Sequence, residues 1–253
     1  MDEAENTTPA AGSAGIWSAT SPSSGGQRFP PQWICWPTLF VAAALLWPRI
    51  AAAAVTLPVA RAVDGYVCRL LINEVPFPGE RGYKSEADSN LAMEGLLRVL
   101  DARLKYIPPG YTQQQVAAVR TSNIIDIITA GGEKGQFDGF YRDASGTPAM
   151  VPRITQRIDN LVSIAGRGRP GKFARLLTHA VALAQSYTSG ALSCRDPHED
   201  VRVVNGVRAT GRAYAWMSDE PQHNPGGNFL PIPDDQEGSL GGNRFFTLRK
   251  EPR

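Results

Sequence analysis

The stretch that decides the fold is Tyr66-Val-Cys-Arg-Leu-Leu-Ile-Asn-Glu-Val75, a largely apolar run that Pro76 and Pro78 bring to an end. A proline cannot continue a helix, because it lacks a backbone N–H and its ring meets the preceding turn. We therefore expect a short, mostly buried helix that carries one acidic residue, Glu74, at its carboxyl end. That residue is either a surface charge or a carboxyl held in a partly dry pocket.

The spacing of apolar and capping residues predicts further helices on the carboxyl side of this run. They are a long helix after Ser85 or Asp88, short helices over residues 113–119 and 123–130, a helix that begins at Pro152, and a last one over about residues 171–187. Beyond residue 190 the chain is loop-like, except for residues 212–217 and 243–248, which we expect to pair as a small sheet. The predicted fold class is mainly α (α+β).

Residues 1–62 differ in composition from the rest of the chain. The first 32 residues are rich in Ser, Thr, Gly, Pro and Ala, which predicts disorder. An apolar run from Trp33 to Trp47 follows, and alanine clusters at residues 51–54 and 60–62 satisfy the small-residue rule for signal-peptide cleavage. We expect residues 1–62 to be a disordered leader with a cleaved export signal, or alternatively an uncleaved membrane anchor. Residues 63–253 would then form a periplasmic or secreted domain.

The charge pattern and the motifs exclude several classes of function. The net charge is +2 and the basic residues are scattered, which does not favour binding to nucleic acid. No phosphate loop, dinucleotide fingerprint or nucleophile elbow occurs in the sequence. His198 and His223 lack the spacing of metal ligands, and His179 lies beside the apolar stripe of the last helix, where we expect a core or boundary histidine rather than a catalyst. We expect a monomer that needs no metal or cofactor and that contacts a membrane only through an uncleaved N-terminal anchor.

Cysteine usage agrees with export. Cys35 lies in the apolar run and would leave with it, so Cys68 and Cys194 remain as an even pair. A disulfide between them would close a loop of over a hundred residues and contribute about 4–5 kcal/mol in the chain-entropy model. Two buried free thiols are the alternative.

Several short motifs follow one another in a recognisable order. They are Ile72-Asn-Glu74, then Glu80, then Arg98-Val-Leu-Asp-Ala-Arg103, then Gly135-Gln-Phe137, and finally Gly242-Asn-Arg-Phe-Phe246. In this order they resemble the bacterial cell wall hydrolase family that includes the spore cortex-lytic enzymes. The resemblance covers roughly residues 66–248 and rests on the order of the motifs, because no single motif is specific. Val75-Pro76 stands where that family usually has Ala-Arg.

The resemblance implies a lysozyme-like helical domain with a small β element near the C-terminus. It implies an exported, peptidoglycan-cleaving glycosidase, a lytic transglycosylase or a muramidase, in which Glu74 acts first as general acid and then as base. The glycan strands of peptidoglycan would be the partner. Glu80 and Gln136 would bind the substrate, with Gln136 hydrogen-bonded to the sugar, and Phe137 and Tyr141 would form a stacking wall.

Three alternatives stay open at this point. Phe137 is a core anchor as readily as a sugar platform. The chain could be a non-catalytic exported module that binds the wall or acts as a scaffold, with Glu74 a surface charge. A hydrolase of a different polymer, such as chitin, is the third.

Overall fold

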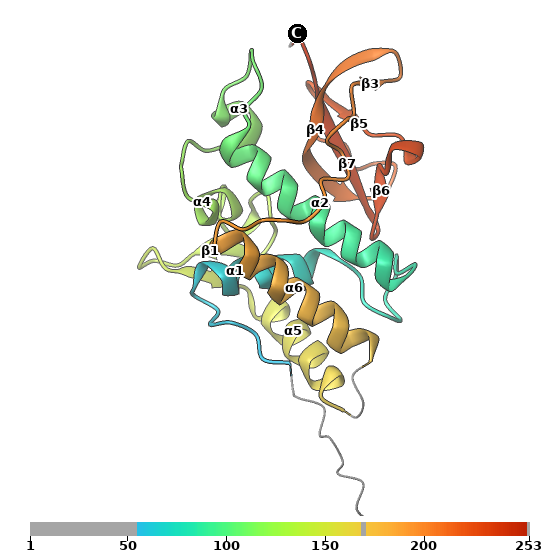
Figure 1. The fold of residues 1–253 in the computed structure, drawn as a ribbon. Helices are drawn as coiled ribbons and strands as arrows, with labels where there is room; N and C mark the ends of the chain where they lie inside the picture. The colour runs from blue at the N-terminus through green and yellow to red at the C-terminus, as the bar shows by residue number, and fades with distance from the viewer. Residues whose placement is uncertain (1–54, 168–170, 252–253) are drawn as a thin grey trace, which may run out of the picture. The chain divides into compact units, whose positions relative to one another are not determined.

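The computed structural model describes residues 55–167 and 171–251. The helices are α1 (Val63–Glu74), α2 (Glu86–Lys105), α3 (Gln113–Ala117), α4 (Ile124–Ile128), α5 (Pro152–Ala165) and α6 (Lys172–Thr188), with short 3₁₀ turns η1 (Gly132–Lys134) and η2 (Asp234–Gln236). The strands are β1 (Phe140–Arg142), β2 (Pro148–Met150), β3 (Val203–Val204), β4 (Val207–Ser218), β5 (Phe229–Pro231), β6 (Ser239–Leu240) and β7 (Asn243–Arg249). Figure 1 shows their arrangement.

Helix α1 lies at the centre of the helical part. It contacts α2, α4, α5 and α6, which explains why its sequence is apolar on nearly every side. Tyr66, Leu70, Leu71 and Ile72 are fully buried in the core that these helices share. Because the helix is enclosed along its length, the residue at its carboxyl end emerges where the helical part meets the sheet.

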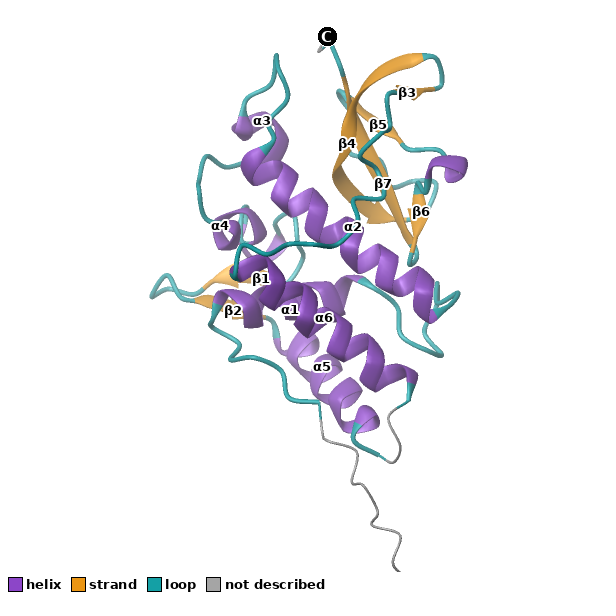
Figure 2. Ribbon diagram, in the orientation of Figure 1, coloured by secondary structure: helices purple, strands orange, loops and turns teal. Residues whose placement is uncertain are grey.

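Helix α2 separates the other helices from the sheet. It contacts α1, α4 and α6 as well as β4 and β6 (Figure 2). Ser85 caps its start, as predicted, and accepts a hydrogen bond from the backbone N–H of Asp88 at 3.0 Å. Gly95 brings the sheet close, because a Cβ there would lie 3.1 Å from the ring of Phe245 on β7. The long helix is therefore the shared wall of both parts.

The sheet is antiparallel and curled. Its strand order is β3-β4-β7-β5, and β6 also pairs with β7. The predicted pairing of residues 212–217 with 243–248 is confirmed, with Trp216 opposite Phe245. The register shifts twice near the middle of β4, where Gly211 has a φ of +87° that favours glycine. This irregularity bends the long strand over α2.

The predicted fold class is wrong in one respect. We expected a mainly helical, lysozyme-like domain with a small β element, whereas the structure has six helices (41% helical) and a five-stranded sheet (16% strand) within its described residues. It is a mixed α+β fold. The short strands β3, β5 and β6 escaped prediction because two or three residues carry no readable alternation. The β1–β2 hairpin lies in a polar, turn-rich stretch and was likewise not expected.

The expected helices are confirmed, with small shifts at their ends. Thr112 forms a capping box with Gln115 at the start of α3, and Asn123 caps α4. Pro152 occupies the first turn of α5, where its missing N–H costs nothing. Capping of this kind can be predicted from the sequence because it depends on residues two or three positions apart.

The described chain begins eight residues before α1. Val55 and Leu57 pack against the core, and Arg69 donates a hydrogen bond to the carbonyl of Pro58 at 2.8 Å.

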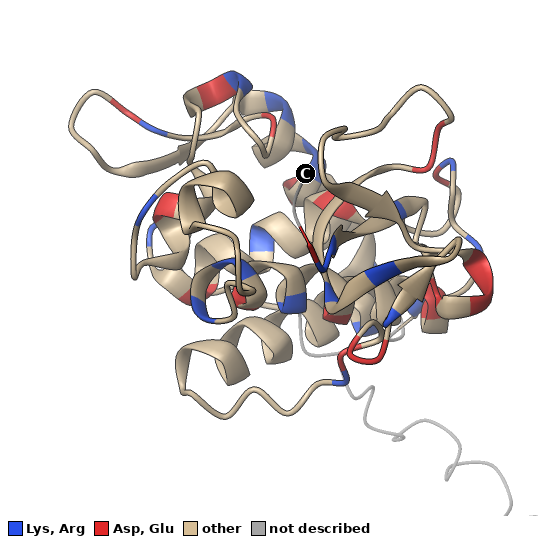
Figure 3. Ribbon diagram, turned by 90° about the horizontal axis from the view of Figure 1, so that it is seen from above, with Lys and Arg blue, Asp and Glu red and all other residues tan. Residues whose placement is uncertain are grey.

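The predicted apolar run and the first alanine cluster lie outside the described residues. Within the described residues, no helix is long and apolar enough to cross a membrane. Basic and acidic residues are interspersed over both the helices and the sheet (Figure 3).

Candidate active site

Glu74, the last residue of α1, lies at a pocket of about 660 Å³. This volume is within the usual range for sites that bind small molecules or segments of a polymer. Helix α1, the η1–β1 segment, helix α5 and the end of β4 all contribute to the lining. The lining residues are Asn73, Glu74, Gln136, Phe137, Asp138, Arg153, Ile154, Arg157, Trp216, Met217, Ser218 and His223.

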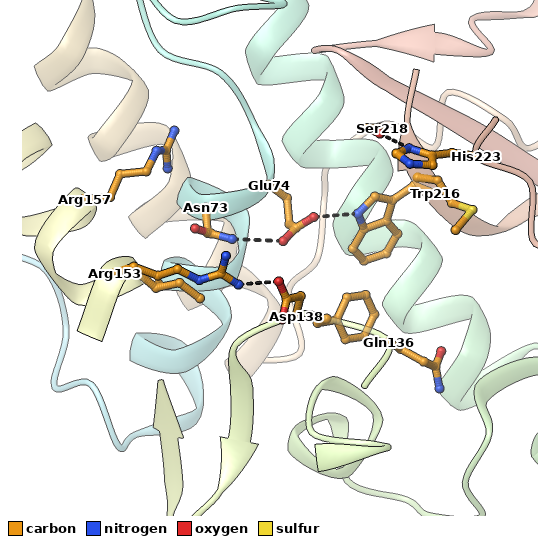
Figure 4. Close-up of a pocket in the computed structure, with 12 residues that line it drawn as sticks. Asn73, Glu74, Gln136, Asp138, Arg153, Arg157, Trp216, Ser218 and His223 are labelled. Atoms are coloured by element: carbon orange, nitrogen blue, oxygen red, sulfur yellow. Dashed lines mark hydrogen bonds and ion pairs between the residues drawn. The ribbon is translucent and has the colours of Figure 1, made fainter. Parts of the chain in front are cut away.

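The Glu74 carboxyl is held by two neutral hydrogen-bond donors (Figure 4). The indole Nε1 of Trp216 donates to Oε2 at 3.0 Å, and the amide Nδ2 of Asn73 donates to Oε1 at 3.1 Å. Burial raises the pKa of Glu74, while these two hydrogen bonds and the charge of Arg157 lower it, and burial outweighs them. A carboxyl in this setting holds its proton to a higher pH than an exposed one.

A second carboxyl, that of Asp138, lines the same pocket. Asp138 forms an ion pair with Arg153 from the first turn of α5, and both side chains are about two-thirds exposed. In Figure 4 this pair is drawn directly below the Asn73–Glu74–Trp216 group. The pocket therefore combines one acid without a cationic hydrogen-bond donor and one acid that is already paired.

Glu80 lies outside the pocket lining. Both of its carboxylate oxygens accept hydrogen bonds from the guanidinium of Arg157, at 2.6 and 3.1 Å, and one also accepts from the backbone N–H of Phe77 at 2.7 Å. These contacts occupy the carboxylate within the protein. The structure thus gives Glu80 a contact with a pocket-lining arginine, and it does not place Glu80 where the predicted substrate contact would be.

Gln136 lines the pocket, but its side-chain amide is engaged by the protein. Its Oε1 accepts a hydrogen bond from Arg103 at 2.6 Å, and its Nε2 donates to the carbonyl of Ala117 at 2.5 Å. The geometry therefore favours a part in holding the loop before β1. One N–H and one lone pair of the amide remain for a ligand.

Phe137 is only 4% exposed and stacks on Trp216, with 4.8 Å between the ring centroids. It belongs to the main apolar core as well as to the pocket, so the core-anchor alternative describes its contacts best. Tyr141 is not among the lining residues. Its backbone carbonyl accepts a hydrogen bond from the hydroxyl of Tyr66 at 3.2 Å, which ties the β1–β2 hairpin to α1. The predicted wall of Phe137 and Tyr141 is not formed.

Arg103 supports this aromatic stack from behind. Its guanidinium lies 5.6 Å from the Phe137 ring centroid and 5.9 Å from that of Trp216, and it donates to the carbonyl of Tyr214 at 2.6 Å. The side chain is nearly fully buried, and burial lowers its pKa to about 10. The faces of two aromatic rings and two oxygen acceptors thus replace the carboxylate partner that a buried arginine usually has.

Sequence reasoning missed Trp216, Asn73, Asp138 and Arg153. Trp216 had a usable signal, because it is the only tryptophan after residue 47 and lies in one of the two stretches predicted to be strands. Asp138 directly follows the Gly-Gln-Phe motif and could have been found by extending that motif by one residue. Nothing in the sequence marks Arg153, whose partner comes from a loop fifteen positions earlier.

The predicted disulfide between Cys68 and Cys194 is not formed, since both are free cysteines. Cys68 is fully buried within α1, where burial raises the pKa of its thiol to about 12. Cys194 is partly exposed in the segment after α6, and its backbone carbonyl accepts a hydrogen bond from Arg98. The two residues share a core but belong to separate elements, so the alternative of two free thiols is the one that the structure shows.

Two observations remain, one on groups that could bind a metal ion and one on similarity to known proteins. In the described part of the chain, no group of three or more His, Cys, Asp or Glu side chains is placed to hold a metal ion. No protein-family model, no curated protein and no solved structure is significantly similar to this chain.

Proposed function

We propose that this protein is a glycosidase in which Glu74 is the general acid. More particularly, we propose that it is exported and cleaves the glycan strands of peptidoglycan. The fold does not support this proposal, because it is not the small helical domain that the sequence motifs implied. The support comes from the residues of the site.

The supporting observation is the setting of one carboxyl. Glu74 faces a pocket of suitable size, its pKa is raised by burial, and its hydrogen-bond donors, Trp216 and Asn73, are neutral. An acid that donates a proton to a glycosidic oxygen must still hold that proton at the working pH, which burial without a paired cation achieves. The negative end of the α1 dipole acts in the same direction.

The residues on which the motif resemblance rests also meet at this place. Asn243, from the last motif, donates a hydrogen bond to the backbone carbonyl of Glu74 at 2.7 Å. Arg103, from the second helix, contacts both Gln136 and Phe137 from the third motif. Motifs spread over 170 positions of sequence thus converge around one acid. This convergence supports the proposal, although the overall fold differs from the expected one.

The chemistry follows from this single group. Glu74 gives its proton to the leaving oxygen as the bond between C1 of N-acetylmuramic acid and that oxygen breaks, and an oxocarbenium-like centre develops at C1. The resulting carboxylate then accepts a proton from the muramic C6 hydroxyl, whose oxygen bonds to C1 and gives an anhydro end. If the carboxylate activates water in place of that hydroxyl, the product is a reducing end. In either case Glu74 is protonated again at the end.

The test is digestion of purified sacculi by the full chain and by Glu74→Gln. We expect the substitution to reduce the release of muropeptides at least about 100-fold, because general acid catalysis contributes about 10² to 10⁴. Glu86→Gln is the matched control, since Glu86 pairs with Arg175 at a surface away from the pocket. Mass spectrometry of the products then distinguishes anhydro from reducing ends.

Two outcomes would contradict the proposal. Activity of Glu74→Gln equal to that of wild type would remove Glu74 from the mechanism. If wild type sediments with sacculi but releases nothing, the non-catalytic wall-binding interpretation is the correct one. Cleavage of chitin oligomers in place of sacculi would keep the mechanism and change the substrate.

A further inference from the structure

The carboxyl end of α1 is finished in an uncommon way. Helices often end in a glycine with positive φ whose turn satisfies the last carbonyls. Here the next residue, Val75, is extended, with φ −116° and ψ 146°, and Pro76 has no N–H to donate. The last carbonyls of the helix that carries Glu74 therefore need partners from elsewhere.

Two side chains from distant elements supply those partners. Arg157 of α5 donates to the carbonyl of Ile72 at 2.8 Å and to that of Val75 at 3.1 Å. Asn243 of β7 donates to the carbonyl of Glu74 itself at 2.7 Å. The backbone on both sides of the Glu74 side chain is thus fixed by a pocket-lining arginine of α5 and by an asparagine of β7.

Arg157 is itself held in one orientation. Glu80 accepts two of its N–H groups, and the Phe77 ring lies 5.7 Å from its guanidinium carbon. The two paired carboxylate bonds and the two carbonyl bonds occupy most of the five N–H donors of the guanidinium. Arg157 is therefore better suited to hold the protein than to bind a ligand, although it lines the pocket.

We propose that Arg157, oriented by Glu80, is a positioning residue that fixes where the Glu74 carboxyl stands in the pocket. This proposal rests on the proposed function, because it concerns the same carboxyl. It gives Glu80, the second acid of the sequence motifs, a task at the site without contact with the substrate.

The charged and titratable groups that line the pocket around Glu74 come from three elements besides α1. They are Asp138 from the segment before β1, Arg153 and Arg157 from α5, and His223 from the loop after β4. Arg157 lowers the pKa of Glu74 and Asp138 raises it. Loss of the Arg157 charge should therefore raise the pKa of Glu74, whereas loss of a purely structural contact should leave that pKa in place.

The experiment compares three variants of the full chain: Arg157→Gln, Arg157→Lys and the control Arg175→Gln. Arg175 also donates two hydrogen bonds to a glutamate, both of 2.7 Å to Glu86, but it does not line the pocket. The titration of Glu74 is followed through its ¹³C-labelled carboxyl carbon, assigned with Glu74→Gln. Digestion of sacculi gives kcat and KM in parallel.

We expect Arg157→Gln to move the Glu74 titration to higher pH and to lower kcat about 10-fold or more, with KM little changed, since small displacements of a reacting group are costly. Arg157→Lys should return the titration toward wild type but not restore kcat, because an ammonium lacks the guanidinium fork. Arg175→Gln should change neither. A kcat of Arg157→Gln equal to that of wild type, or identical Glu74 titrations in all variants, would overturn the proposal.

The test also covers two cases, an Arg157→Gln variant that does not fold and a wild type that cleaves nothing. If Arg157→Gln does not fold, Glu80→Gln keeps the arginine but removes its orienting charge, and it should lower kcat in a smaller step with KM little changed. If wild type cleaves nothing, the proposed function fails, yet the titration still shows whether Arg157 governs Glu74. If wild type cleaves sacculi at a normal rate and Arg157→Gln leaves the Glu74 titration unchanged, only the positioning role of Arg157 is rejected.

Discussion

Glu74 and Glu80 are two acids of one short segment, and the protein treats them in opposite ways. The Glu80 carboxylate is met by a guanidinium through two hydrogen bonds, whereas the donors to Glu74 are an indole and an amide, both neutral. The same arginine lies near both acids, but it bonds to the side chain of only one. Proximity in sequence therefore does not decide which acid is fit for chemistry.

The difference teaches how a carboxyl is kept ready to give up a proton. A paired cation stabilises the charged form of an acid, and burial among neutral donors favours the protonated form. A single segment can thus contain an acid for structure and an acid for catalysis, provided that the fold directs the cation to one of them. The following predictions change the partners of each acid in turn.

The largest effect is expected for Trp216→Phe. It removes the Nε1 hydrogen bond to Glu74 and part of a ring that is 9% exposed, and we expect a loss of about 2–3 kcal/mol in the free energy of unfolding. Because this hydrogen bond lowers the pKa of Glu74, the pKa should rise further when it is lost. Urea unfolding and ¹³C titration measure the two effects.

The control for that prediction is Tyr214→Phe on the same strand. Its hydroxyl donates to the carbonyl of Tyr106 at 2.7 Å, without contact with Glu74. We expect it to reduce stability but to leave the Glu74 titration unchanged. If both variants shift that titration equally, the indole contact is not what sets it.

A smaller effect is expected for Glu80→Gln. The change removes the charge that orients Arg157, and an acceptor is kept for the Phe77 N–H, so we expect a loss of about 1–2 kcal/mol. Both side chains of the pair are about one-third exposed, which limits the loss. Midpoints of urea unfolding give the value. If Glu80→Gln loses no more stability than Glu86→Gln, the Glu80–Arg157 pair stabilises the protein no more than the surface pair Glu86–Arg175 does.

The smallest effect, and one of opposite sign, is expected for the stability of Glu74→Gln. The folded-state pKa of Glu74 lies above its ordinary value of 4.5, so its stabilisation is complete below that value and is lost as the pH rises through the folded pKa. Glutamine has no such loss. Stability of the variant relative to wild type should therefore increase from about pH 4 to about pH 8.

Glu86→Gln should show the reverse trend. Its hydrogen bond from Arg175 lowers the pKa of Glu86, so wild type gains from this group above the ordinary value and loses that gain as the pH falls. A pH trend of the same sign for Glu74→Gln and Glu86→Gln would contradict the difference drawn between the two kinds of acid.

The sequence predicted the parts of this molecule whose causes are local. Helix starts at Ser85, Thr112 and Asn123 follow from side chains that bond to a backbone N–H two or three residues ahead. Glu74 could be singled out because an acid at the end of an apolar helix is conspicuous, and its pocket justified the choice of the dry alternative.

What the sequence did not predict depends on contacts between distant segments. Arg103 lies on a helix with an ordinary pattern, and only the fold brings it to Trp216, 113 positions later. Glu80 was assigned from its place in the motif order and Tyr141 for its aromatic ring, and the fold directs one to Arg157 and leaves the other outside the pocket. The five-stranded sheet was underestimated because its short strands are defined by pairing with β4 or β7 rather than by their own sequences.

The order in which the chain is made gives one of these contacts a further meaning. The wall of the pocket that holds Trp216 and the cap on Glu74 from Asn243 come from the last fifth of the chain, while Glu74 itself is made early. A chain that emerges from the ribosome or crosses a membrane amino end first has its acid long before it has the surroundings that tune that acid. Under the proposed function, the surroundings of the acid are complete only once residues 216 and 243 have been made and have folded against α1.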